Sequence, residues 1–181
     1  MKIELKLPNW LSQINAEKAG TVYQSIEQRA EFVIELSRLN IDHNTGGPFA
    51  AAIFDIKDNT LICAGTNLVI STNCCVTHAE ITAIILAQQK LGTYGLADSQ
   101  LVSSCQPCAM CMGAIPWSGI KSLICCASDE DARAIGFDEG DKPDHWIKKY
   151  NARGIEDIVD LLRSKAAEVL YEYAQQGGKM Y

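Results

Sequence analysis

The chain has 181 residues, a length that typically forms one domain. With 48% hydrophobic and 21% charged residues it can bury a core, which excludes disorder as its main state. Acidic residues outnumber basic ones by 22 to 16, and the resulting net charge of −6 opposes binding to nucleic acid phosphates.

Hydropathy and cysteine content argue against a membrane-spanning protein, a secreted protein and a disulfide scaffold. The longest apolar run, residues 49–54, is far shorter than a membrane helix, and the first residues lack the continuous apolar segment of a signal peptide. Eight cysteines are too few for a disulfide scaffold in a chain of this length. We therefore expect a cytoplasmic protein with reduced thiols, no membrane partner and no nucleic acid partner.

The first half of the chain predicts one helix and a β-hairpin behind an N-terminal extension. Residues 1–20 show no clear periodicity and are interpreted as that extension, ahead of a single domain over residues 21–174. From Thr21 to Leu39, apolar residues recur at three- and four-residue steps, which indicates an amphipathic helix. Apolar runs over Ala50–Ile56 and Leu61–Leu68 flank polar turn residues, the pattern of a β-hairpin.

The second half predicts alternating helices and strands. Thr77 stands three residues before Glu80, which predicts a capping box at the start of a helix that ends near Leu91. Pro107 suits the first position of another helix. The other expected elements are strands over Gln100–Ser104 and Lys121–Ala127 and a last helix over Ile155–Tyr173. Strands joined by a helical crossover pair in parallel, so we expect an α/β fold.

One histidine and two cysteines at the predicted helix starts form a candidate metal site. Cys108 and Cys111 are three residues apart, so their thiols share one face of a helix, whose N-terminus favours the thiolate form. His78 begins the preceding predicted helix. Three such ligands are one fewer than a structural zinc site has, and a catalytic zinc keeps the fourth position for water. We therefore expect one catalytic Zn²⁺ per chain.

Glu80 is the candidate proton carrier beside this metal. The order His-x-Glu followed by Pro-Cys-x-x-Cys is the signature of zinc-dependent deaminases. Zinc lowers the pKa of its water to about 7, and a nearby carboxylate can take that proton and pass it to the substrate. Cys105 is a competing ligand by spacing, but it precedes Pro107 and is expected to be a core thiol.

Several segments of the chain resemble the cytidine deaminase superfamily, and within it the guanine deaminases. They lie between residues 22 and 139 and comprise Gly46–Phe49, Gly65–Asn67, Thr77–Glu80, Ser104–Cys111 with Gly113–Ile115, and Gly136–Glu139. The resemblance implies a three-layer αβα sandwich around a central mixed sheet of about five strands. It also implies zinc-dependent hydrolytic deamination of guanine to xanthine and ammonia.

The same resemblance implies which residues meet the base. Glu139 faces the substrate as a second catalytic residue, Asn67 contacts the base and Phe49 packs on its ring. Ala79 and Asp138 belong to the same motifs and are expected among the substrate-binding residues. The amine and ring N–H groups of guanine suit a carboxylate acceptor, whereas its oxygen and unprotonated ring nitrogens suit an amide donor.

Residues 175–181 are interpreted as a tail that closes the site. Gly177 and Gly178 form a flexible joint after a helix, and an aromatic residue beyond them, Tyr181, can cover a pocket and exclude water. The resemblance supports this interpretation, because related guanine deaminases close their pocket with an aromatic C-terminal tail of the same or the neighbouring subunit. The alternative is a frayed end without function.

We expect a small-molecule purine base as partner and a homodimer as the assembly, because the apolar run Met112–Trp117 adjoins the metal site and the superfamily commonly oligomerises near its active sites. Three alternatives stay open. One is the same chemistry on another small base, such as an aminotriazine, cytosine or a nucleoside. The second is adenosine in transfer RNA, which the acidic stretch 128–145 disfavours. The third is a zinc-binding module without turnover.

Overall fold

A mixed sheet in the order β2-β1-β3-β4-β5 forms the centre of the molecule. The computed structural model describes residues 5–181. Strand β1 is antiparallel to both neighbours, whereas β3, β4 and β5 run parallel. This arrangement confirms the predicted hairpin and the predicted parallel pair. The strands are β1 (Ala50–Asp55), β2 (Leu61–Thr66), β3 (Ser99–Cys105), β4 (Ser122–Ala127) and β5 (Glu156–Ile158).

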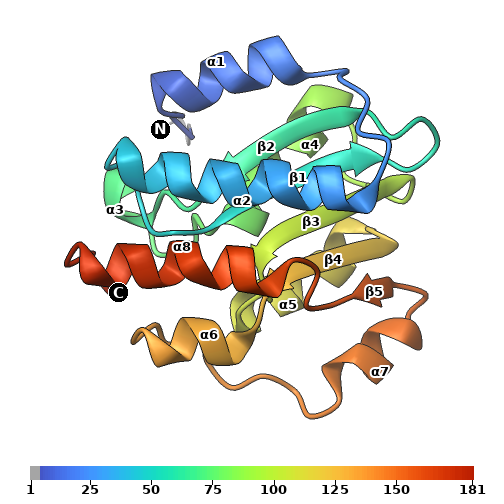
Figure 1. The fold of residues 1–181 in the computed structure, drawn as a ribbon. Coiled ribbons are helices and arrows are strands. Elements are labelled where there is room, and N and C mark those ends of the chain that lie inside the picture. The colour runs from blue at the N-terminus through green and yellow to red at the C-terminus, as the bar shows by residue number, and fades with distance from the viewer. Residues whose placement is uncertain (1–4) are drawn as a thin grey trace.

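Helices cover both faces of this sheet (Figure 1), so the expected three-layer αβα sandwich is confirmed. Helices α2 and α8 lie side by side on one face, and α4 and α5 lie on the other. None of the helices among residues 5–181 has the length and apolar character that crossing a membrane requires. The helices are α1 (Asn9–Lys18), α2 (Ile26–Asp42), α3 (Val69–Thr72), α4 (Ala79–Leu91), α5 (Ala109–Ser118), α6 (Asp129–Ala134), α7 (Trp146–Asn151) and α8 (Arg163–Gln175).

Strand β1 is buried on both faces because successive side chains enter different parts of the core. Ala52 and Phe54 pack with residues of α1 and α2, whereas Ile53 packs with residues of α4. On the neighbouring strand, a Cβ at Gly65 would lie 2.8 Å from the carbonyl oxygen of Ala79. The absence of a side chain at Gly65 therefore lets the first turn of α4 approach the sheet closely.

The N-terminal segment differs from its interpretation as an aperiodic extension. Residues 1–4 lie outside the described residues, and α1 follows them. In α1, Leu11 is fully buried. The Asn15 amide donates to the Ala64 carbonyl at 2.9 Å, and the Ala64 N–H donates back to Asn15 Oδ1 at 2.8 Å. Helix α1 thus covers edge strand β2, whose free backbone groups would otherwise be open to pairing.

The predicted capping box at Thr77 is wrong. The N-cap of α4 is His78, and the Thr77 hydroxyl donates to the Cys74 carbonyl at 2.7 Å instead of capping the helix. In the same way, α5 has Cys108 as its N-cap, so Pro107 stands before the cap and not at the first helical position. Both helices therefore begin with a candidate metal ligand in extended backbone conformation.

The single helix expected over Ile155–Tyr173 is also wrong. Residues 156–158 form β5, which extends the sheet by pairing in parallel with β4. Asp160 and Leu162 then adopt positive φ angles of 62° and 55°, which a continuous helix cannot contain. Helix α8 begins only at Arg163 and ends at Gln175, close to the expected end. Pairing with an available sheet edge outweighs the helical periodicity of the first residues of this segment.

Candidate zinc and substrate site

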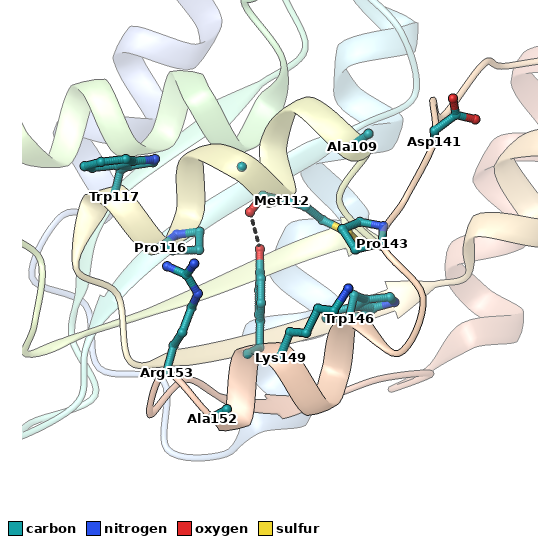
Figure 2. A pocket seen from close by; sticks show the side chains of 12 residues that line it. Ala109, Met112, Pro116, Trp117, Asp141, Pro143, Trp146, Lys149, Ala152 and Arg153 are labelled. Atoms are coloured by element: carbon teal, nitrogen blue, oxygen red, sulfur yellow. Dashed lines mark hydrogen bonds between the residues drawn. The ribbon is translucent and has the colours of Figure 1, made fainter.

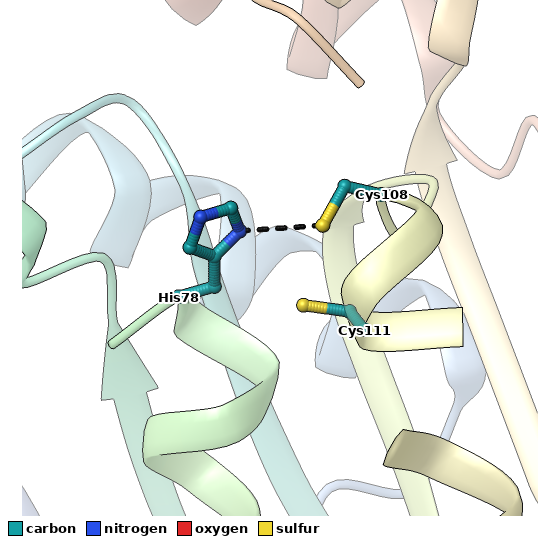
Figure 3. Close-up of side chains that lie close together, drawn as sticks. All are labelled: His78, Cys108 and Cys111. Carbon is teal, nitrogen blue, oxygen red and sulfur yellow. Dashed lines mark hydrogen bonds between the residues drawn. The ribbon is translucent and has the colours of Figure 1, made fainter. Parts of the chain in front are cut away.

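The N-termini of α4 and α5 bring the three candidate metal ligands together. The chain leaves β3 at Cys105 and enters α5 at Cys108, and the start of α4 lies beside it. His78 Nδ1 and Cys108 Sγ are 3.4 Å apart, and these atoms and Cys111 Sγ all lie within 4.8 Å of one another (Figure 3). The structure thus places the three predicted ligands at one point.

This donor set fits zinc. Bond lengths of about 2.0 Å to nitrogen and about 2.3 Å to sulfur in tetrahedral geometry separate two ligands by roughly 3.5 Å, close to the observed distance between His78 and Cys108. The hydrogen bond from Cys111 lowers the pKa of the Cys108 thiol to about 4 despite burial, and the interaction with His78 acts in the same direction. Cys108 therefore favours the thiolate form that zinc requires.

The Glu80 carboxylate lies directly beside these ligands. It is buried, accepts a hydrogen bond from Ser103 Oγ at 3.1 Å and is 3.4 Å from the Cys111 thiol. Burial raises the pKa of Glu80, an effect that favours proton uptake. Because Glu80 takes no part in a capping box, its carboxylate is free to point into the site.

Cys105 lies outside the ligand group. Its buried thiol donates to the Ser128 carbonyl at 3.4 Å, at the junction of β4 and α6. Burial raises the pKa of this thiol well above its ordinary value, which opposes the thiolate form. These observations agree with the interpretation of Cys105 as a core thiol.

A cavity of about 30 Å³ adjoins the metal ligands. This is far below the roughly 300–1,000 Å³ of a typical ligand pocket, so the cavity is narrow in this structure. Every residue that the sequence analysis assigned to the substrate lies in its wall. The lining residues are Phe49, Asn67, His78, Ala79, Glu80, Cys105, Gln106, Cys108, Phe137, Asp138, Glu139 and Tyr181.

Asn67 follows the end of β2 and is held by its backbone. Its N–H donates to the Phe49 carbonyl at 2.9 Å, and its carbonyl accepts from the Asn40 amide at 2.9 Å. Its Oδ1 accepts from the Val69 N–H at 3.2 Å. Within the described part of the chain, no acceptor pairs with the Asn67 Nδ2 group, which leaves a donor for the cavity.

Glu139 and Asp138 occupy different environments in the loop after α6. Glu139 is 7% exposed, and burial raises its pKa to about 7 despite the opposing effect of Lys142. Its carbonyl accepts from the Ala109 N–H at 2.9 Å, which ties the loop to the start of α5. Asp138 is exposed, and its carboxylate accepts from the Gly140 N–H at 2.9 Å. Glu139 therefore provides a buried carboxylate at the cavity, whereas the Asp138 carboxylate stabilises the conformation of the loop.

Tyr181 reaches the cavity from the C-terminal tail of the same chain. Its ring meets the Phe137 ring edge-on, with centroids 5.3 Å apart, and its hydroxyl occupies the space where a Cβ on Gly47 would stand. The Tyr173 hydroxyl fixes the tail by donating to the Lys179 carbonyl at 2.8 Å. The tail thus packs on its own subunit in this structure.

Ser103 contributes to the site although the sequence motifs do not point to it, and Phe137 contributes from within one of those motifs. Ser103, on β3, donates its hydroxyl to Glu80. The alternation of side chains along a strand is the only sequence signal for the face of the sheet toward which Ser103 points. Phe137 belongs to the Gly136–Glu139 segment that resembles the guanine deaminases. It is buried and lines the cavity, where it packs against Phe49 with centroids 4.8 Å apart.

A second, larger groove of about 550 Å³ lies between α5 and α7 (Figure 2). The Tyr150 hydroxyl donates to the Met112 carbonyl at 2.8 Å and ties the two helices together. Trp117, at the end of the apolar run Met112–Trp117, belongs to this groove and is 89% exposed. It does not line the cavity at the metal ligands.

Comparisons with known proteins identify a matching family and similar solved structures. Residues 24–127 match the family described as cytidine and deoxycytidylate deaminase zinc-binding region. A solved guanine deaminase from Nitrosomonas europaea is 44% identical, with a TM-score of 0.91 over 96% of this chain and 97% of its own. The protein designated NE0047, solved in complex with 2,6-diaminopurine, is 44% identical, with a TM-score of 0.92 over 98% of this chain and 95% of its own. Guanine deaminase of Bacillus subtilis is 42% identical over 106 residues, which are 59% of this chain and 67% of the relative.

Proposed function

The chain belongs to the cytidine and deoxycytidylate deaminase family, and we propose that it hydrolyses guanine to xanthine and ammonia. The observation that carries this proposal is the likeness to the N. europaea guanine deaminase over almost the whole chain. The cavity supports it, because a buried carboxylate and a free amide donor meet beside the metal ligands. These groups match the donors and acceptors on the edges of guanine.

The metal ligands in this proposal are His78 Nδ1, Cys108 Sγ and Cys111 Sγ. When bound, zinc lowers the pKa of a water molecule to about 7 and so makes a nucleophile available at neutral pH. Cys108 and Cys111 are buried and His78 is partly buried, which limits contact between solvent and these side chains.

Glu80 moves the protons of the reaction. Its carboxylate takes a proton from the attacking water and passes it to a ring nitrogen. It then takes the remaining proton from the hydroxyl on C2 and delivers it to the departing amine. A bond from C2 to oxygen forms and the bond from C2 to the amine nitrogen breaks, so water and guanine give xanthine and ammonia. The Ser103 hydroxyl orients one carboxylate oxygen, Oε1.

The cavity wall orients the base. Asn67 Nδ2 donates to an acceptor of guanine, and the Glu139 carboxylate accepts from its N–H groups. The Ala79 N–H, at the first position of α4, has no partner within its own helix and is available as a second donor. Phe49 supplies an aromatic edge for the flat ring, and Asp138 holds the loop that carries Glu139.

The test of the proposed function is a screen of the purified zinc protein for ammonia release. Guanine, other purines, cytosine, cytidine and aminotriazines are compared at equal concentration. We expect the highest kcat/KM on guanine, with xanthine as the second product. Release of ammonia from another base but not from guanine favours the alternative substrates, and the absence of any turnover favours a zinc-binding module.

The C-terminal tail is proposed to act as a lid. Deleting residues 179–181 removes Tyr181 from the cavity wall but leaves α8 and the metal ligands in place. We expect unchanged folding and zinc content with guanine kcat/KM lowered about tenfold or more, since each 1.4 kcal/mol of lost transition-state binding is a factor of ten. Circular dichroism, zinc analysis and steady-state kinetics measure the three quantities, and full activity of the truncated protein contradicts the lid.

The groove between α5 and α7 is proposed as the contact of a homodimer. Trp117 is 89% exposed beside apolar residues of α5, and an exposed aromatic of this size is typical of a protein contact. We expect a dimer at micromolar concentration by light scattering and a monomer after Trp117→Glu. A wild-type monomer contradicts the proposal.

We further propose that the enzyme works in the cytoplasm on a small base and binds neither nucleic acid nor membrane. Thiolate ligands such as Cys108 and Cys111 stay available for zinc in a reducing compartment. The net charge of −6 disfavours a nucleic acid substrate. Cell fractionation tests the location, and a gel shift with transfer RNA at low salt tests the binding.

A further inference from the structure

A buried lysine stands between two carboxylates behind the substrate cavity. The side chain of Lys142 is 11% exposed, and its Nζ atom is shielded from solvent. The ammonium forms an ion pair with Asp129, at the start of α6, and lies 3.3 Å from Glu139 Oε2. Burying an ammonium is costly unless charges of opposite sign compensate it, and here two carboxylates do so.

The loop that carries Glu139 has other contacts that hold its backbone. Arg133 donates to the Gly140 carbonyl at 2.7 Å and pairs with Asp129 at 2.7 Å. The Ala109 N–H donates to the Glu139 carbonyl at 2.9 Å. These contacts fix the path of the loop without Lys142. The specific effect of Lys142 therefore falls on the Glu139 side chain.

The orientation of the Glu139 carboxylate matters because its two oxygens have different surroundings. Oε2 is 3.3 Å from the Lys142 ammonium, and this ion pair does not include Oε1. Glu139 also lines the cavity beside the metal ligands. An ionised carboxylate only accepts hydrogen bonds, so a fixed, charged Glu139 favours bases that present N–H groups there.

We infer that Lys142 is a positioning residue that holds the Glu139 carboxylate toward the N–H edge of the base. This inference rests on the proposed function for the identity of the base. Asp129 completes the arrangement as the second carboxylate that pairs with the ammonium. Lys142 touches no reacting atom, and its effect on turnover passes through Glu139.

A double-mutant cycle tests this dependence. Lys142→Met is expected to lower guanine kcat/KM by about 10- to 100-fold, the usual scale for losing a partner that orients a functional side chain, with unchanged zinc content. In a Glu139→Gln background the same substitution is expected to have almost no further effect. Lys142→Arg is expected to recover part of the activity, because it keeps the charge. Lys57→Met, which breaks the exposed ion pair with Asp98, is the matched control and is expected to match the wild type.

Equal losses from Lys142→Met in the two backgrounds overturn the inference, because they show an effect that does not pass through Glu139. A crystal structure of Lys142→Met gives a readout that does not depend on the substrate. The Glu139 carboxylate is expected to leave its position in the cavity wall, and an unchanged carboxylate also overturns the inference. A wild-type enzyme that is inactive on guanine contradicts the proposed function instead, and the crystal structure still decides the role of Lys142.

Discussion

Replacing Glu80 with glutamine is expected to leave zinc bound and to lower guanine turnover by about 10²- to 10⁴-fold. The amide has the shape of the carboxylate, and its oxygen can still accept from Ser103 Oγ, as Glu80 does at 3.1 Å. It cannot take a proton from water or deliver one to the departing amine. The loss therefore falls on the chemical step, and kcat from ammonia release together with zinc analysis measures it.

Two features of the structure make this prediction specific. The helix cap at α4 is His78, so the substitution at Glu80 removes no capping interaction and folding should be preserved. Glu31→Gln is the matched control, since the partly exposed carboxylate of Glu31 pairs with Lys165 at the surface. A Glu80→Gln variant that retains wild-type turnover would show that another group carries the proton.

The zinc ligands could be predicted from the sequence because short motifs at the starts of two helices identify them. His78 and the cysteine pair at 108 and 111 each stand at a helix start, and the spacing of the two cysteines alone places their thiols on one side of one turn. The short connection between β3 and α5 then places the cysteine pair beside the start of α4. Ligand identity, ligand count and the place of Glu80 next to them followed without knowledge of the sheet order.

The features that the sequence did not reveal depend on distant contacts. Residues 156–158 form a strand only because β4 offers a free edge, and α1 is stabilised by Asn15 pairing with the backbone of β2. The charge of Lys142 gave no hint of its burial, because the compensating Asp129 lies thirteen positions earlier on another element. Local periodicity cannot contain such information, since the partner that decides each case comes from another part of the fold.

Replacing either Cys108 or Cys111 with serine is expected to remove zinc and guanine turnover together. A serine hydroxyl stays protonated at neutral pH and is a poor zinc ligand, whereas the pKa of the Cys108 thiol is already lowered to about 4 by its hydrogen bond from Cys111. Two remaining ligands hold zinc weakly, and loss of a bound metal also lowers the stability of the folded chain. Metal analysis, ammonia release and thermal unfolding measure the three effects.

Cys105→Ser is the matched control, because all three cysteines are buried and lie within one short segment of the chain. The Cys105 thiol donates to the Ser128 carbonyl, a hydrogen bond that a serine hydroxyl can also make, so the expected cost in stability is about 1 kcal/mol. This variant should keep one zinc per chain and its activity. Equal loss of metal from all three variants would contradict the assignment of the ligands, since it would place Cys105 in the zinc site or make metal loss a general consequence of substituting buried thiols.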